Sequence, residues 1–307
     1  MRLLPFSRSL LHTIAIVLGY FATVLCTTVA VAMAADERVK KPLVVTTVKP
    51  LALIAAQALG NRARVEWLYA PQQSPHHQPL RPSMLRTIES ADLVVWVGPI
   101  LEAPLASYLE AQPQQRVVTF AELVQLEEPG NTKFVAENSH VHDHDHHPHD
   151  VAVDPHLWLQ PAYAERLAAE LQRRIGLSAQ PLLSRQELGD WHRQLGRLQN
   201  RTWLMPHRSL DYFSDFFMLN RASALATADG VEGGLRHQLT LLEQDNYRCI
   251  MVEQSEPDKR MARFAKRLVR PLISIDTLAA SQPLTVRPYS DFIAGLVETT
   301  ARCLSAP

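Results

Sequence analysis

From residue 43 onward, short runs of β-branched residues alternate with segments of helical periodicity, and this alternation constrains the fold more than any other feature. It predicts strands over residues 43–48, 64–69, 93–97 and 116–119, with helices over 51–59, 83–90 and 101–111 between them. Strands that are joined through helices run parallel, and the helices cover both faces of their sheet. The sequence therefore predicts an α/β fold.

A second series of the same kind begins near residue 201. It predicts strands over 202–205, 223–226, 249–253 and 272–275, followed in turn by helices near 207–217, 231–243, 257–268 and 290–303. Between the two series, helical periodicity and a capping box formed by Ser184 and Glu187 predict connecting helices. We expect two α/β lobes with mainly parallel sheets, joined by a long helix: an N-terminal lobe (35–160), connecting helices (161–200) and a C-terminal lobe (201–307). Ligands of open sheets bind beyond the carboxyl ends of the strands, so a cleft between the lobes is the expected site.

The first 34 residues have the features of an export signal. Arg2 and Arg8 precede a long apolar run, which ends in Ala32-Met33-Ala34 directly before charged residues. This pattern predicts a signal peptide over residues 1–34 and export of the mature chain. The apolar run is also long enough to span a bilayer, so an uncleaved membrane anchor is the alternative.

Removal of the signal leaves two of the three cysteines, Cys249 and Cys303. In an oxidising compartment such a pair is a candidate disulfide. The bond would join a predicted strand to the C-terminal helix, close a loop of about 50 residues and stabilise the fold by roughly 3–4 kcal/mol.

The charge composition argues against polyanionic partners. The chain has 31 Lys and Arg and 31 Asp and Glu residues, so no global field would steer it to nucleic acid or to an anionic membrane.

Histidines occur in two settings. Residues 130–153 show no apolar period and predict an inserted loop, which carries six histidines: His140, His142, His144, His146, His147 and His149. A flexible loop loses ordering entropy on every ion it binds, so we interpret this run as an accessory metal loop. The isolated histidines His76, His156 and His207 instead follow prolines at the edges of ordered segments. A lone loop histidine is more often a surface residue than a ligand, so spacing alone defines no site.

The sequence around these three histidines resembles the periplasmic zinc-binding proteins of ABC-type high-affinity zinc uptake systems. The segments that carry the resemblance are SPHHQPLRPS (74–83), ADLVVWVGP (91–99), HLWLQP (156–161) and HRSLDYF (207–213), within a similarity that extends from about Leu43 to Cys303. The resemblance implies that His76, His156 and His207 are metal ligands. It also implies that the His- and Asp-rich loop is a zinc-type signature and that the two cysteines pair.

Three neutral imidazoles suit tetrahedral Zn²⁺ and leave one position open. In manganese-type relatives an aspartate that follows a strand completes the site, and Asp276 has the comparable place here. Capping the next turn at Thr277 is the alternative role of Asp276. On this resemblance we expect a monomeric, non-enzymatic solute-binding protein of the periplasm that captures Zn²⁺ and delivers it to an ABC permease, with no nucleic-acid partner.

The chain departs from the family pattern beside two of the ligands. Pro75 stands where zinc-type relatives often have a glutamate, His77 is added, and Arg208 replaces the aspartate that usually follows the third histidine. A cation next to a metal-binding imidazole costs electrostatic energy unless it turns to solvent or pairs, for example with Asp211.

Three other functions remain open on the sequence. They are a periplasmic zinc buffer or metallochaperone, a binding protein for another divalent metal such as manganese, and an exported zinc hydrolase. For the hydrolase, Glu253 at the end of a predicted strand is the one fair candidate for a general base.

Overall fold

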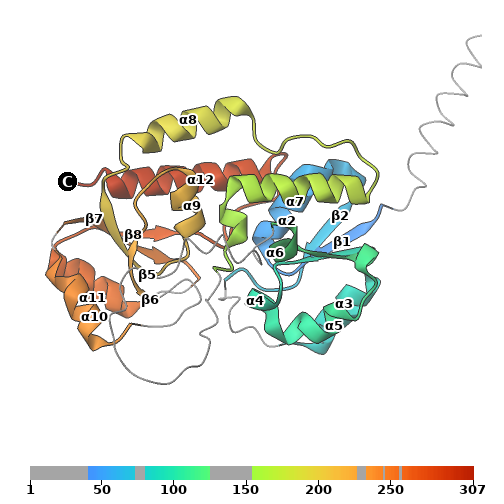
Figure 1. Cartoon of the computed structure of the whole chain (residues 1–307), viewed down its shortest axis with the longest axis horizontal. Coiled ribbons are helices and arrows are strands. Elements are labelled where there is room, and N and C mark those ends of the chain that lie inside the picture. The colour runs from blue at the N-terminus through green and yellow to red at the C-terminus, as the bar shows by residue number, and fades with distance from the viewer. Residues whose placement is uncertain (1–40, 73–79, 125–153, 227–232, 245, 256–257) are drawn as a thin grey trace, which may run out of the picture. The chain divides into compact units, whose positions relative to one another are not determined.

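The computed structural model describes residues 41–72, 80–124, 154–226, 233–244, 246–255 and 258–307. They form two four-stranded sheets, one in each lobe, and neighbouring strands run parallel throughout (Figure 1). The strand order is β2-β1-β3-β4 in the N-terminal lobe and β6-β5-β7-β8 in the C-terminal lobe. The predicted α/β fold is confirmed.

The N-terminal lobe contains strands β1 (Leu43–Thr46), β2 (Arg64–Trp67), β3 (Leu93–Trp96) and β4 (Val117–Thr119), with helices α2 (Lys49–Leu59), α3 (Pro82–Ser90), α4 (Pro99–Glu102), α5 (Ala106–Glu110) and α6 (Phe120–Leu123). Short 3₁₀ turns η1 (Gly60–Arg62), η3 (Ala103–Leu105), η4 (Gln114–Arg116) and η5 (Leu157–Leu159) lie between elements. Helices α7 (Pro161–Arg174) and α8 (Arg185–Gly196) connect the lobes. The C-terminal lobe contains strands β5 (Thr202–His207), β6 (Ser223–Ala226), β7 (Tyr247–Glu253) and β8 (Leu272–Ile275), with helices α9 (Asp211–Phe216), α10 (Leu235–Glu243), α11 (Lys259–Leu268) and α12 (Pro288–Leu304).

Burial explains the composition of the central strands. All four residues of β1 and of β3 are buried, and both strands consist almost entirely of Val and Leu. The edge strand β2 alternates between exposed and half-buried residues. Strands of a parallel sheet that is covered on both faces consist of continuous apolar residues, and for this reason the sequence predicted both β1 and β3 as strands.

Three predicted helices differ from the observed ones. The helix expected over 101–111 is divided into α4, η3 and α5, because Pro104 lacks an N–H donor and cannot continue a regular helix. The long connecting helix is two helices, and Gly176 adopts a left-handed conformation (φ 75°) just after α7 ends. The segment expected to be helical from residue 207 begins as strand, since β5 extends to His207 and α9 starts only at Asp211.

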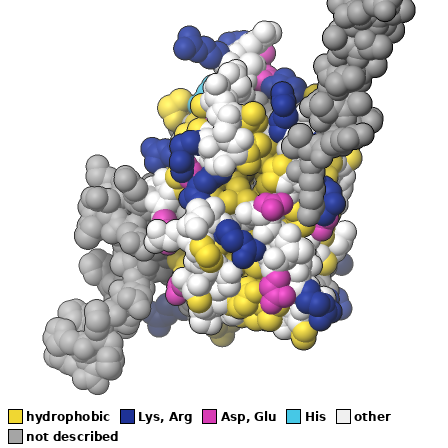
Figure 2. Space-filling model, turned by 90° about the vertical axis from the view of Figure 1, so that its right-hand side faces the viewer, with side chains coloured by type: hydrophobic (Ala, Val, Ile, Leu, Met, Phe, Trp, Pro, Cys, Tyr) yellow, Lys and Arg dark blue, Asp and Glu magenta, His cyan; other side chains and the backbone are white. Residues whose placement is uncertain are grey.

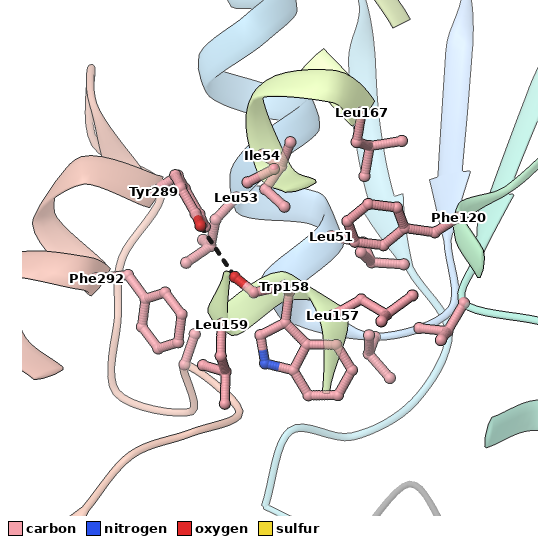
Figure 3. Close-up of a cluster of buried hydrophobic side chains, with 14 of the residues drawn as sticks. Leu51, Leu53, Ile54, Phe120, Leu157, Trp158, Leu159, Leu167, Tyr289 and Phe292 are labelled. Carbon is pink, nitrogen blue, oxygen red and sulfur yellow. Dashed lines mark hydrogen bonds between the residues drawn. The ribbon is translucent and has the colours of Figure 1, made fainter. Parts of the chain in front are cut away.

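One hydrophobic core extends through both lobes. The turn η5 is fully buried and packs among side chains of α2, such as Leu53, and of α12, such as Phe292 (Figure 3). The hydroxyl of Tyr289 donates to the carbonyl oxygen of Trp158 at 2.9 Å. A smaller cluster lies within the C-terminal lobe, between its sheet and helices α10 and α11.

A glutamine on α2 also joins the lobes. The side-chain oxygen of Gln57 accepts from the backbone N–H groups of Tyr289 at 2.9 Å and Ser290 at 3.0 Å. These are first-turn donors of α12, which have no partner inside their own helix. Its amide nitrogen donates to the carbonyl of Leu182 at 2.6 Å, so one side chain ties α2, α12 and the segment before α8 together.

The predicted disulfide is present. Cys249 on β7 is bonded to Cys303 on α12, with a Cα–Cα distance of 5.4 Å and a sequence separation of 54. Closing a loop of this length removes entropy from the unfolded chain equivalent to about 4 kcal/mol. The bond holds the last helix against the strand that ends in Glu253.

The face shown in Figure 2 carries basic and acidic side chains interspersed with hydrophobic ones, without a broad area of one sign. None of the helices in the described ranges has the length and apolar character that a membrane span requires. The predicted signal peptide, residues 1–34, lies outside the described residues.

Candidate metal site

His207 lies at the carboxyl end of β5, where the order of the second sheet reverses. Strands β6 and β7 flank β5 on opposite sides, so the ends of β5 and β7 meet at the topological switch point where open sheets bind ligands. Glu253 is the last residue of β7, and its Oε2 is 3.0 Å from Nδ1 of His207. Both side chains are buried. The carboxylate accepts from the Nδ1–H group and thereby directs Nε2 to the opposite side of the ring.

His156 has the same kind of carboxylate partner from its own loop. Oδ1 of Asp154 is 2.8 Å from Nδ1 of His156 and also accepts from the backbone N–H of His156 at 2.9 Å. The turn η5 follows immediately, and its three apolar side chains are fully buried. The histidine is therefore held by the hydrophobic core on one side and by Asp154 on the other.

The two imidazoles, distant in sequence, face each other in space. Their ring centroids are 5.4 Å apart and the ring planes are tilted by 44°. A zinc ion bound to both Nε2 atoms at about 2.1 Å, with a tetrahedral angle between them, would place the centroids roughly 5.2 Å apart. The observed separation fits two ligands of one tetrahedral ion.

Burial governs the protonation states of His156 and Asp154. Burial lowers the pKa of His156 to about 3, and the neighbouring His207 lowers it further while Glu253 opposes the shift. Burial also raises the pKa of Asp154 to about 7, against the hydrogen bond from the His156 amide. The imidazole of His156 is consequently neutral at physiological pH, the form that binds a metal.

Arg208, the departure beside His207, is paired. Its guanidinium lies 2.8 Å from Asp211, as the sequence led us to expect. Arg221 pairs with Asp215 at 2.7 Å and lies 3.6 Å from Asp211. Burial raises the pKa of Asp211 to about 6, and both arginines act in the opposite direction. The positive charge next to the third predicted ligand is thus balanced locally.

Asp276 follows β8, as predicted, and its carboxylate is occupied by the loop that comes after it. Oδ1 accepts from the Ala280 amide at 2.8 Å, and Oδ2 accepts from the Ser281 amide at 2.8 Å and the Ser281 hydroxyl at 2.6 Å. These contacts match the alternative role, in which the aspartate caps the next turn, although at Ala280 and Ser281 rather than at Thr277. A role of Asp276 as fourth ligand remains a prediction.

The other predicted ligands lie outside the described residues. These are His76 and the six histidines of the accessory loop: His140, His142, His144, His146, His147 and His149. Among the residues that are described, no three His, Cys, Asp or Glu side chains form a group that could hold a metal ion. That His156 and His207 form a metal site together with His76 stays a prediction.

The sequence did not identify the partners of the two imidazoles. Asp154 could have been found, because an aspartate two residues before a loop histidine can bond both its backbone and its ring. Glu253 was noted only as a candidate base. Its contact with His207 joins two strands 46 residues apart and had no local signal.

Comparison with known proteins gives a consistent result. The model of the family "ZnuA: Zinc-uptake complex component A periplasmic" matches residues 44–179. The high-affinity zinc uptake system protein ZnuA of Yersinia pestis is 25% identical over 290 residues, covering 85% of this chain and 91% of that protein.

Two solved structures have the same fold. The periplasmic zinc-binding protein TroA of Treponema pallidum superposes with a TM-score of 0.66 at 17% identity, covering 87% of this chain and all of TroA. A crystal structure of ZnuA gives a TM-score of 0.63 at 19% identity, again over 87% of this chain and all of that one.

Proposed function

We propose that the chain is a member of the family of periplasmic zinc-uptake components, whose model matches residues 44–179, and that it captures Zn²⁺ between its two lobes and delivers it to an ABC permease. The observation that carries the proposal is the pair of buried imidazoles, 5.4 Å apart, each with Nδ1 on a carboxylate. This arrangement fixes both rings before the ion arrives.

In the proposed coordination, Nε2 of His156 and Nε2 of His207 bind the ion together with His76. Three neutral imidazoles favour zinc over magnesium or calcium, which prefer oxygen ligands. The fourth position is taken by water or by a carboxylate, for which Asp276 is the candidate from the sequence. Zinc is the cargo of this protein, which works as a monomer in the periplasm.

The contacts of Glu253 favour binding over hydrolysis. A general base has to reach a metal-bound water, but both oxygens of Glu253 are occupied, one by His207 and the other by the hydroxyl of Thr277. We infer that Glu253 orients a ligand and that the protein is not an enzyme.

Competition titration with Zn²⁺ and Mn²⁺ tests the proposal. The protein without residues 1–34 should bind one zinc ion tightly and manganese at least about tenfold more weakly, because imidazole ligands favour zinc. His156→Ala should abolish the tight site. His192→Ala is the control, since the His192 ring packs against Phe216 and Phe217 and is not one of the predicted ligands. Tight zinc binding by His156→Ala would refute the assigned site, and equal affinity for manganese would refute the assigned cargo.

Deletion of residues 140–149 distinguishes a zinc-uptake protein with one tight site from a zinc buffer that stores metal in the loop. We expect the deletion variant to keep the tight site and to lose only weaker ions, because the sequence around these histidines shows no apolar period that would pack them in a fixed geometry. Isothermal titration of both proteins measures the number of ions in each class. Loss of the tight ion on deletion would instead support a zinc buffer that stores metal in the loop.

A further inference from the structure

Two donors from the N-terminal side of the molecule hold one loop of the C-terminal lobe. This loop, residues 276–281, follows β8 and is called the β8 loop below. The indole Nε1 of Trp158 donates to the carbonyl of Thr277 at 2.9 Å. Nζ of Lys49, at the start of α2, donates to the carbonyl of Ala280 at 3.1 Å. Asp276 closes the loop on itself through Ala280 and Ser281. The loop is therefore held rigidly against η5 and α2.

The β8 loop also reaches the partner of His207. The hydroxyl of Thr277 donates to Oε1 of Glu253 at 2.5 Å, and Oε2 of Glu253 is 3.0 Å from Nδ1 of His207. Thr277 is 2% exposed and Glu253 is 3% exposed, so water does not replace these contacts. Thr277 thus links Trp158, two residues beyond His156, to the ring of His207: its carbonyl accepts from Trp158, and its hydroxyl donates to the carboxylate that contacts His207.

We propose that Thr277 is a positioning residue for the metal site. Its hydroxyl holds the Glu253 carboxylate that orients His207, and its carbonyl, which accepts from Trp158, fixes the position of that carboxylate relative to His156. This inference deepens the proposed function and rests on it. A carboxylate with a donor on only one oxygen can rotate about its terminal bond, whereas donors on both oxygens hold it in one plane. The Thr277 hydroxyl provides the second donor.

The link to Trp158 extends the effect to both ligands. Trp158 is fully buried, and its indole donates to the backbone carbonyl of Thr277. The hydroxyl of the same Thr277 donates to Glu253. The distance between the His156 and His207 rings is thereby set through the β8 loop as well as through the core. Partners that orient metal ligands from outside the coordination shell typically contribute 10–100-fold to affinity.

The test compares Thr277→Val, which removes the hydroxyl at nearly constant volume, with Thr277→Ser, which keeps it. We expect zinc affinity to fall about tenfold or more in the valine variant and to stay within about threefold of the wild type in the serine variant. Thr240→Val is the matched control, because the exposed Thr240 hydroxyl donates to the carbonyl of Arg236 within α10. Equal losses in the valine and serine variants, or no loss in either, would overturn the proposal.

A double-mutant cycle and a metal-free measurement complete the test. If Thr277 acts through Glu253, then Thr277→Val should have little further effect on zinc affinity in a Glu253→Ala background, which lacks the carboxylate, and additive losses would overturn the proposal. Nitrogen-15 spectra of the His207 ring without zinc should show the Nδ1-protonated tautomer in the wild type and in Thr277→Ser, and a mixture of tautomers in Thr277→Val. An unchanged ring spectrum in Thr277→Val would count against the relay. Because this readout needs no metal, it tests Thr277 even if the wild type fails to bind zinc.

Discussion

At the scale of single residues, the site depends on the pairing of each imidazole with a carboxylate. His156 and His207 reach this pairing by different routes, one through Asp154 in the same loop and the other through Glu253 on the adjacent strand. The common result is that Nδ1 is engaged by a carboxylate, which leaves Nε2 for the proposed metal. Arg208 does not disturb this arrangement, since Asp211 pairs with it.

The contact between Asp154 and His156 predicts a graded loss of zinc affinity. We expect Asp154→Ala to bind zinc about 10–100-fold more weakly, because the His156 ring loses the acceptor that orients it. Asp154→Asn retains one acceptor oxygen and should lie between the wild type and the alanine variant. Asp190→Ala, which removes a half-exposed partner of Arg193, is the control. Competition with a zinc chelator gives the three affinities, and a wild-type value for Asp154→Ala would contradict the prediction.

At the scale of elements, α8 is held to α12 through one glutamate. Ser184 and Glu187 form the capping box expected from the sequence. Glu187 also accepts from the hydroxyl of Ser290 at 2.6 Å and from the guanidinium of Arg287 at 2.5 Å. Partial burial would raise the pKa of Glu187, but the hydrogen bonds from Arg287, Ser184 and Ser290 outweigh it and lower the pKa to about 2. A local cap and a long-range contact thus meet on one side chain.

This lowered pKa predicts a pH-dependent contribution to stability. The unfolded chain takes up the proton near the usual glutamate value and the folded protein only near pH 2, so the contribution is complete above about pH 4.5 and declines as the pH falls toward 2. Glu187→Gln should lower the free energy of unfolding by about 1 kcal/mol at pH 7, since the contacts are partly exposed.

Urea unfolding from pH 7 to pH 3 measures this difference between the wild type and Glu187→Gln. The difference should narrow below pH 4.5, because Glu187 of the unfolded wild type then takes up a proton that folding must release, whereas the glutamine of the variant does not titrate. Glu110→Gln, at an exposed position of α5, serves as the control and should show no such trend. A difference that stays constant down to pH 3 would contradict the assigned cause.

At the scale of the whole molecule, the continuous core limits relative motion of the lobes. The fully buried η5 turn lies between α2 and α12, and Gln57, Trp158 and Lys49 each bond across the same junction. Hinge closure requires a junction that can open, and close-packed cores are not continuously deformable. We therefore expect zinc to enter without a large rotation of one lobe against the other.

Small-angle X-ray scattering tests this expectation. The scattering curves of the zinc-free and the zinc-loaded protein should superpose, because zinc binding does not rotate one lobe against the other. Both samples lack residues 1–34 and 140–149, so these segments do not contribute to the curves. His156→Ala in the same background corrects for any effect of zinc outside the site. A clear decrease in the radius of gyration on zinc binding, absent from His156→Ala, would show lobe closure and contradict the prediction.

The sequence by itself determined the alternation of strands and helices, the parallel sheets, the capping box at Ser184 and the candidate disulfide, because each of these depends on periodicity or on residue type over a short stretch. It also singled out His156 and His207 by their prolines and by family resemblance. Only the tertiary structure decided which carboxylate each ring contacts, that Thr277 reaches Glu253, and that Asp276 bonds its own loop. Most of these contacts join residues from different strands and loops, and their partners are selected by the packing of the shared core, which no local pattern encodes.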